Sequence, residues 1–166
     1  MSDLVEFLRA RLFEDEDTAR RAADNRTRPN GGPDSSGDER WQWVETHSGE
    51  RLRLGRYPND RLEGPVSLRS VDEYPLRSRY GYGPHHVLDT SNVDVNVALH
   101  MARHSPARVV AEVAVKRRLL ELHSRMNGTG VCQACGERVR EGGCMTLRLL
   151  ATPYSDHPAY RTTWRA

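Results

Sequence analysis

The segment from His123 to Cys144 constrains this chain most, because it contains all three cysteines of the 166-residue sequence. Cys132 and Cys135 enclose two residues and are followed by Gly136, a spacing typical of a tight turn that directs two sulfurs to one point. Eight residues separate His123 from Cys132, and eight more separate Cys135 from Cys144. Three thiolates and one imidazole form the ligand set of a closed, tetrahedral structural zinc site. The segment therefore predicts one structural zinc ion bound by His123, Cys132, Cys135 and Cys144.

Other interpretations of the same segment stay open. The cysteines can be three free thiols, two of them in a glycine-rich loop. A redox-active Cys-x2-Cys pair typically lies at the start of a helix, whereas this pair is followed by Gly136 in a loop. The fourth ligand is less strongly indicated than the three sulfurs, since His157 is a rival to His123 and His104 is a more distant one.

The composition indicates a hydrophilic protein with a modest core. A chain of this length most often forms one domain, with room for a small appendage. Hydrophobic residues make up 37% of the sequence, and no apolar run approaches the ~20 residues of a membrane-spanning helix. The first residues lack the basic and then apolar pattern of a signal peptide. An odd number of cysteines fits a reducing compartment, so we expect a cytoplasmic protein that does not enter a membrane.

An amphipathic helix is predicted for Asp3–Ala23, the first of four regions. Leu4, Leu8 and Leu12 recur at every fourth position and give this helix one apolar face. Residues 24–40 follow with two prolines and three glycines but no apolar residue that anchors them. They are predicted to be a flexible linker, because proline and glycine interrupt regular elements.

Residues 41–90 are predicted to form a small antiparallel β-sheet with a loop insertion. Trp41 and Trp43 share one face of a strand, and Ser48 begins a Ser-Gly turn. Residues 57–84 are rich in Arg, Tyr, Gly and Pro, and apart from a short apolar run at residues 66–68 they show no pattern that assigns them a helix or a strand. Short strands are predicted at residues 41–44, 51–54, 66–68 and 87–88.

Residues 91–166 are predicted to be a helical, zinc-binding region, which makes the fold class α+β. Ser105 and Pro106 are typical of a helix start, with proline at the first helical position. His123 and Cys144 are expected near helix ends, with a zinc-knuckle-like loop held between them. The expected helices cover residues 93–103, 106–123 and 144–151, and Leu149, Tyr154, Tyr160 and Trp164 are expected to bury the C-terminal end.

His85, His86 and Asp89 form the alternative candidate site, that of a small enzyme. Histidine and aspartate can act together in acid–base chemistry near neutral pH. The sequence contains no nucleophile elbow and no glycine-rich phosphate loop, so an enzyme is the less favoured interpretation. His100 and His104 lie four residues apart, but this loose spacing fits a polar helix edge better than a metal site.

The net charge of +2 conceals an asymmetry along the chain. Residues 1–99 contain 14 basic and 18 acidic residues, whereas residues 100–166 contain 11 and 5. Basic charge favours an acidic protein or a nucleic acid as partner. The use of arginine with a single lysine, Lys116, also follows from a GC-rich genome without selection for binding. We expect a small binding or adaptor protein, regulatory in role, that contacts protein or nucleic acid through its basic C-terminal part.

Several segments outside the linker and residues 57–84 are distinctive. They are residues 3–12 (DLVEFLRARL), Trp41 and Trp43, residues 100–109 (HMARHSPARV), 115–118 (VKRR), the Cys132-x2-Cys135 pair, 144–151 (CMTLRLLA), 153–160 (PYSDHPAY) and the final Trp164-Arg165. Together they are similar to a family of small uncharacterised proteins, a domain of unknown function found in actinobacteria and their phages. The resemblance implies an intracellular protein from a GC-rich host or phage. It implies no activity, substrate or catalytic residue.

Overall fold

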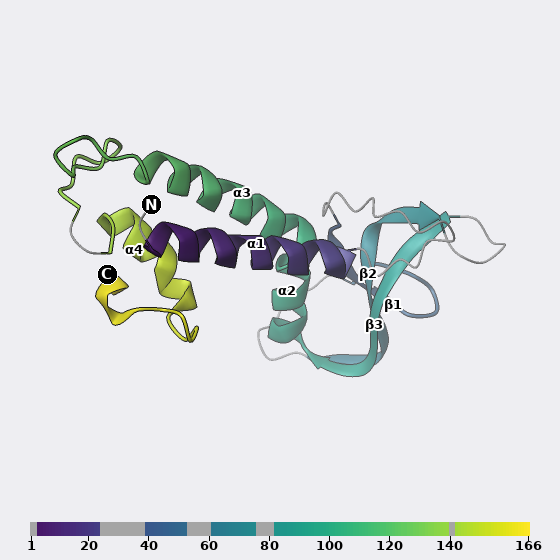
Figure 1. Ribbon diagram of the computed structural model, residues 1–166. Helices are drawn as coiled ribbons and strands as arrows, with labels where there is room; N and C mark the ends of the chain where they lie inside the picture. Colours follow the sequence, from purple (N-terminus) through teal and green to yellow (C-terminus); the bar gives the residue numbers. More distant parts are fainter. Residues whose placement is uncertain (1–2, 24–38, 53–60, 76–81, 140–141) are drawn as a thin grey trace. The chain divides into compact units, whose positions relative to one another are not determined.

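The computed structural model describes residues 3–23, 39–52, 61–75, 82–139 and 142–166 (Figure 1). The chain forms two compact units. The first, called the knuckle unit below, comprises Met1–Asp17 and Ala111–Ala166, and the second, the sheet unit, comprises Thr18–Val110. The N-terminal and C-terminal parts of the sequence therefore fold together.

The predicted α+β class is confirmed, with an N-terminal helix, a three-stranded antiparallel sheet and C-terminal helices. None of the described helices is long and apolar enough to cross a membrane. In chain order the elements are α1 (Asp3–Ala23), β1 (Trp41–Glu45), β2 (Arg61–Pro75), β3 (Tyr82–Asp94), α2 (Val95–Arg103), α3 (Pro106–His123), α4 (Met145–Ala151) and two short 3-10 helices, η1 (Thr152–Tyr154) and η2 (Thr162–Trp164).

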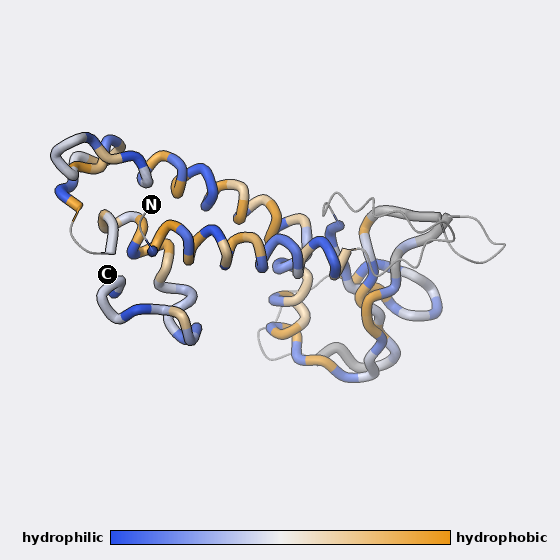
Figure 2. The backbone as a smooth tube through the Cα atoms, in the orientation of Figure 1, coloured by the Kyte–Doolittle hydropathy of each residue, from blue (hydrophilic) through white to orange (hydrophobic). Residues whose placement is uncertain are grey.

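The core of the knuckle unit is built on the apolar face of α1. Leu4, Leu8 and Leu12 are all buried, as their four-residue spacing predicts. Along α1 the hydropathy alternates between apolar and polar positions, as expected for a helix with one buried face (Figure 2). The other buried apolar residues of the unit are Val5, Phe7, Val113, Leu120, Cys132, Cys144, Leu147, Ala151 and Trp164.

Phe7 is the centre of an aromatic cluster that fixes the C-terminal segment of the knuckle unit. Its ring centroid lies 5.0 Å from that of Trp164 and 5.6–6.3 Å from the rings of three other residues, which meet it edge-on. Edge-to-face aromatic pairs contribute about 0.5–1.5 kcal/mol beyond the area that they bury. The three edge-on partners are Tyr154, His157 and Tyr160.

Polar contacts join the same C-terminal segment to α1. The Tyr154 hydroxyl donates to the carboxylate of Asp15, and Arg161 forms an ion pair with Asp3. The prediction that Leu149 is buried in this region is wrong, because 57% of Leu149 is exposed. The buried face of α4 holds Leu147 and Ala151, which their four-residue spacing places on one side of the helix.

The sheet unit has strand order β1-β2-β3, with antiparallel pairing throughout. Trp43 faces Leu68 across β1 and β2, and its indole nitrogen donates to the carbonyl of Ala98 in α2 at 2.9 Å. This bond satisfies the one polar atom of a buried tryptophan side chain and aligns α2 with the sheet. One core cluster of the unit consists of Trp43, Val66, Leu68 and Ala98, with Trp41, Leu52, Val87, Val93, Met101 and Ala102 packed against it.

The strands are longer than the sequence pattern indicates. The short strands predicted at residues 66–68 and 87–88 are parts of β2 and β3, which have 15 and 13 residues. Their pairing shifts register three times, at Glu63/Val66, Leu68/Arg69 and Arg69/Glu73. Such irregularities break the alternation of apolar and polar residues by which a strand is recognised. This explains why the full length of β2, which lies within residues 57–84, could not be recognised in the sequence.

The predicted turn, the second predicted strand and the predicted linker compare differently with the structure. The turn at Ser48 is confirmed, since the Glu45 amide donates to the Glu50 carbonyl at 2.9 Å, although β1 pairs chiefly with β2. Of the predicted strand 51–54, residues 53–54 lie outside the described residues, as do residues 24–38 of the predicted linker. Glu39, placed in that linker, is buried and accepts a hydrogen bond from the Trp41 indole at 2.8 Å.

Candidate metal centre

Residues 124–139, called the knuckle below, contain three short backbone segments that lie side by side. Met126 pairs with Cys132, and Val131 pairs with Arg138, both in antiparallel fashion. The Cys132 amide also donates to the Glu137 carbonyl at 2.9 Å. These pairs hold Cys132 in the middle segment, where its surface is 0% exposed.

Asn127 closes the turn between the first two segments. Its side-chain oxygen accepts hydrogen bonds from the amides of Thr129 and Val131, at 3.0 and 2.9 Å. Asparagine stabilises turns in this way because its short side chain imitates the backbone. Asn127 was not identified from the sequence, although the Asn-Gly-Thr-Gly run that it begins is a turn signal.

Cys132 and Cys135 occupy one tight turn. The Gly136 amide donates to the Cys132 carbonyl at 2.9 Å, and Gly136 has a φ of 72°. Glycine adopts this left-handed conformation without steric cost, so the chain can reverse directly after Cys135. Cys135 is exposed, whereas Cys132 and Cys144 are buried.

His123 is the last residue of α3 and lies between the two buried sulfurs. Its Nδ1 atom is 3.7 Å from the Cys132 sulfur and 3.5 Å from the Cys144 sulfur. Leu120, one turn earlier on the helix, is buried, and this orients the same helix face toward the core. The helical spacing from Leu120 to His123 thus delivers the imidazole to the sulfurs.

Cys144 is the N-cap residue of α4 and follows Gly143, whose φ is 84°. A Cβ atom at Gly143 would lie 3.1 Å from the Leu4 side chain and 3.3 Å from that of Leu147. Both separations are tighter than ordinary van der Waals contacts. A glycine is needed here because both the backbone conformation and the close approach of Leu4 disfavour a side chain.

Glu137 connects the knuckle to α4, and it was not identified from the sequence. Its carboxylate accepts a hydrogen bond from the Met145 amide at 2.7 Å, and its other oxygen lies 3.5 Å from the Arg148 guanidinium. A carboxylate is favoured here because the first turn of a helix has free amides. Since its carbonyl also accepts from Cys132, Glu137 links the turn that carries two cysteines to the helix that follows the third.

The ligand atoms of His123, Cys132, Cys135 and Cys144 all lie within 4.8 Å of one another. With Zn–S near 2.3 Å and Zn–N near 2.0–2.1 Å, a tetrahedral zinc site has ligand–ligand separations of roughly 3.6–3.8 Å. The two sulfur–imidazole distances are close to this value, and no separation exceeds it by more than about one ångström. The four residues chosen from the sequence thus lie together and fit a metal ion of this size.

The sulfurs differ in their electrostatic surroundings. Burial, together with the neighbouring Cys132 sulfur, raises the pKa of Cys144 to about 11. Burial acts in the same direction on Cys132, but the amides of Cys135 and Ala134 donate to its sulfur and hold its pKa below the usual thiol value. Adjacent thiolates repel one another, and a bound divalent cation removes this repulsion by supplying positive charge. The site is therefore suited to a cation.

A family model described as "Family of unknown function (DUF6221)" matches residues 1–166, the full length of the chain. The chain belongs to this family. The family resemblance noted in the sequence is thereby confirmed, while an actinobacterial or phage source stays a prediction. Comparisons of this DUF6221 protein with curated proteins and with solved structures found no match.

The rival histidines of the DUF6221 protein lie in other surroundings. His157 packs its ring on Phe7, and its Nδ1 accepts a hydrogen bond from the Ala159 amide at 3.0 Å. His104 stacks on His100 with ring centroids 4.3 Å apart. Among the described residues, the only group of three or more possible metal-binding side chains is the one that contains His123.

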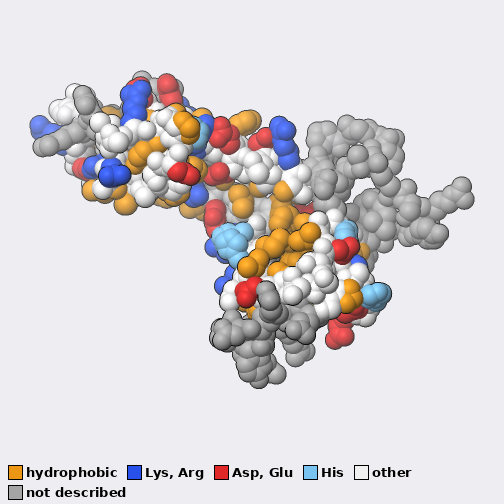
Figure 3. All heavy atoms as spheres, turned by 90° about the horizontal axis from the view of Figure 1, so that it is seen from below, with side chains coloured by type: hydrophobic (Ala, Val, Ile, Leu, Met, Phe, Trp, Pro, Cys, Tyr) orange, Lys and Arg blue, Asp and Glu red, His pale blue; other side chains and the backbone are white. Residues whose placement is uncertain are grey.

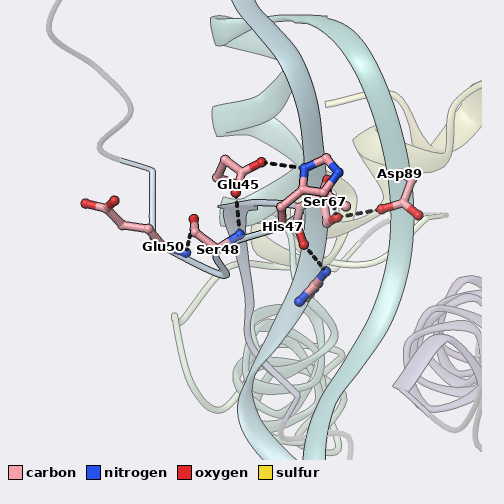
Figure 4. A network of polar contacts seen from close by, with 8 residues as sticks. Glu45, His47, Ser48, Glu50, Ser67 and Asp89 are labelled. Atoms are coloured by element: carbon pink, nitrogen blue, oxygen red, sulfur yellow. Dashed lines mark hydrogen bonds and ion pairs between the residues drawn. The ribbon is translucent and has the colours of Figure 1, made fainter.

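The second candidate site of the DUF6221 protein lies on β3, where Asp89 is hydrogen-bonded to Ser67 of β2 (Figure 4). One carboxylate oxygen of Asp89 accepts from the Ser67 hydroxyl at 2.5 Å and lies 2.7 Å from His86 Nε2. The Ser67 hydrogen bond lowers the pKa of Asp89 below its usual value. In a Ser-His-Asp triad the histidine stands between the other two and accepts the serine proton. Here the aspartate stands in the middle, so the Ser67 hydroxyl donates to Asp89 and not to a histidine base. His85 lies in β3, next to His86.

Proposed function

We propose that this DUF6221 protein is a small zinc-stabilised binding protein whose metal holds the knuckle unit and presents the knuckle to a protein partner. The observation that carries the proposal is the convergence of one imidazole and three sulfurs within 4.8 Å. These donors come from the end of α3, one tight turn and the start of α4. A single ion at this point connects the last residue of α3, the Cys132–Cys135 turn and the first residue before α4.

Zinc fits these donors better than other common metals. Thiolate and imidazole are soft or borderline ligands, which select zinc over magnesium and calcium. Zinc also accepts tetrahedral geometry and undergoes no redox change. Three cysteines and one histidine are a recurrent ligand set of structural zinc sites.

The proposed role of zinc is structural. Catalytic zinc sites typically have three protein ligands and keep a fourth position for water or substrate, whereas four protein ligands leave no such position. Cys132 and Cys144 are both 0% exposed, so two of the ligands belong to the core of the knuckle unit. Zinc at this site is therefore held by the buried core of the knuckle unit and does not line an accessible cleft.

Cobalt substitution tests the site and its fourth ligand. We expect one Co²⁺ per chain with the visible bands of a tetrahedral ion and thiolate charge-transfer bands, and displacement by zinc. His123→Ala should weaken binding, whereas the matched changes His157→Ala and His104→Ala should leave the spectrum unchanged, because those rings contact other groups. An octahedral spectrum, or a loss of binding in His157→Ala alone, would contradict this assignment.

The charge of the knuckle unit favours a protein over a nucleic acid as the partner. The basic C-terminal part folds with the acidic start of α1, and the whole unit contains 11 basic and 11 acidic residues. Arg117 pairs with Glu16, and Arg161 pairs with Asp3. The knuckle also has no aromatic residue on which a base can stack.

The exposed face of the knuckle carries the chemistry that a protein partner requires. Arg125 and Arg138 are exposed and form no ion pair with any described residue, and Met126 is 38% exposed. On the face that Figure 3 displays, basic and acidic side chains are interspersed with apolar ones. Methionine adapts to varied apolar surfaces, and arginine is enriched at protein interfaces. The face is complementary to an acidic surface with an apolar centre.

Photo-crosslinking in the native host tests this face. A photoreactive residue at position 126 should give a discrete protein adduct, and Arg125→Glu with Arg138→Glu should abolish it by reversing the charge. The control position is Phe13 on α1, which is more accessible than Met126, with 63% of its surface exposed against 38%. An adduct that is digested by nuclease would show that the partner is a nucleic acid and not a protein. Equal adducts from positions 126 and 13 would refute the proposal that the exposed face of the knuckle is a specific binding surface.

A further inference from the structure

We propose that the Cys132–Cys135 turn is a peroxide-responsive switch, in which oxidation to a disulfide releases the bound metal. This inference rests on the proposed zinc site and concerns its regulation. The structure places one accessible and one buried sulfur on the same four-residue turn, within the 4.8 Å that spans the whole ligand group. The other two ligands lie on different elements, so oxidation divides the site into a pair that reacts and a pair that does not.

Cys135 is the ligand residue that an oxidant in solution can reach. Among the four ligand residues it alone is exposed, while His123 is half-buried and the other two cysteines are buried. A zinc-bound thiolate keeps nucleophilic character, and oxidation follows thiolate character and exposure. A small hydrophilic peroxide therefore meets the sulfur of Cys135 before any other ligand of the site.

Cys132 is the resolving sulfur because it shares the turn. The Gly136 amide holds the Cys132 carbonyl at 2.9 Å, which keeps both ends of the turn close together. A disulfide requires sulfurs about 2.0 Å apart and Cα atoms usually within about 7 Å. A four-residue turn with sulfurs already within 4.8 Å reaches this geometry by a small movement. Cys144 is fixed by its position at the start of α4 and by the packing of Gly143 against Leu4.

The reaction consumes one peroxide and two protons and leaves zinc in the same oxidation state. The Cys135 sulfur attacks one peroxide oxygen, so an S–O bond forms, the O–O bond breaks and the leaving oxygen takes a proton to become water or an alcohol. The Cys132 sulfur then attacks the Cys135 sulfur, so the S–S bond forms and the S–O bond breaks. The departing hydroxide takes the second proton and leaves as water. Two thiolates become one disulfide, and zinc departs as Zn²⁺.

Release of the ion follows from the ligand count. A disulfide sulfur is a poor zinc ligand, so only His123 and Cys144 remain, which is half of a closed structural set. Cys132 lies at 0% exposure in the middle segment of the knuckle, so movement of its sulfur disturbs pairs that build this segment. Reduction by a thiol restores both thiolates and allows the metal to bind again.

The experiment uses the full chain loaded with one zinc and treated with a small excess of hydrogen peroxide, with a colorimetric chelator that reports free zinc. We expect release of one zinc per chain together with loss of two thiols, a Cys132–Cys135 disulfide in peptide mass spectra, and recovery after a thiol reductant and zinc are added. Cys135→His is the matched variant, because it keeps a zinc ligand but removes the accessible thiol. It should retain zinc at the peroxide dose that empties the unaltered chain.

Several results would overturn the switch. Zinc that stays bound after peroxide treatment would do so, as would release only when sulfinic or sulfonic acid forms, or a disulfide that includes Cys144. In these cases the proposed zinc site would still stand, because the experiment begins with a chain that has bound one zinc ion. A chain that binds neither zinc nor cobalt at the four residues would instead overturn the proposed function and this inference together.

Discussion

Removal of the metal is expected to unfold the knuckle unit while the sheet unit keeps its structure. In zinc-finger peptides metal binding contributes an apparent free energy of about 10–16 kcal/mol, whereas whole domains are stable by only about 5–15 kcal/mol. Two of the four ligands, Cys132 and Cys144, are core residues, so loss of the ion also leaves buried polar atoms without their partner. The core of the sheet unit contains none of the four ligands.

Hydrogen exchange with mass spectrometry checks this result. A strong chelator, or the change Cys132→Ala, should remove protection from amides of α4 and of the C-terminal part of α3, whereas amides of β1 and α2 should stay protected. His104→Ala serves as the control, because this ring stacks on His100 and belongs to no ligand group of the described residues. Unchanged protection of α4 after metal removal would refute a structural role for the ion.

Phe7→Ala is expected to be the most destabilising change outside the metal site. The Phe7 ring is 8% exposed and contacts four other rings, so its loss opens a cavity and separates the C-terminal segment from α1. Truncation of a buried phenylalanine costs about 3–5 kcal/mol. For a domain the size of the knuckle unit, each kcal/mol lost lowers the melting temperature by about 4–8 °C. This predicts that the melting temperature of the knuckle unit decreases by roughly 12 °C or more.

Phe13 offers a matched control, since it is the other phenylalanine of the chain and lies on the same helix. It is 63% exposed, so Phe13→Ala should change the free energy of unfolding by no more than about 0.5 kcal/mol. Thermal denaturation of the zinc-loaded chain, followed by circular dichroism, compares the two variants. Equal shifts in melting temperature would mean that the aromatic cluster does not hold the unit together.

The helices followed from local signals in the sequence. The bounds of α1 and α3 agree with their prediction, because the spacing of leucines and the position of Pro106 act within a few turns of one helix. α2 begins two residues after its predicted start, where Asp94 accepts hydrogen bonds from the amides of Asn96 and Val97. The three cysteines and His123 were also chosen locally, from residue type and spacing alone.

The strands could not be predicted to the same extent, because strand pairing joins residues that are distant along the chain. Ser67 meets Val44 on one side and Asp89 on the other, and no local pattern encodes either pairing. Register shifts within β2 and β3 removed the periodicity that would have revealed their full length. Leu149 lies two residues from both Leu147 and Ala151, away from the buried face of α4, so its apolar side chain alone was a poor guide to its burial.

The sequence by itself determined which side chains are available for a metal and how α1 and α3 begin and end, since both depend on residue type and short-range spacing. Only the tertiary structure decided that the four side chains meet, that Glu137 joins the knuckle to α4, and that Cys135 is the accessible sulfur. It also decided the charge of the surface, because α1 brings its carboxylates into the same unit as the basic C-terminal part. Charge along a chain becomes charge on a surface only when folding sets which segments lie together.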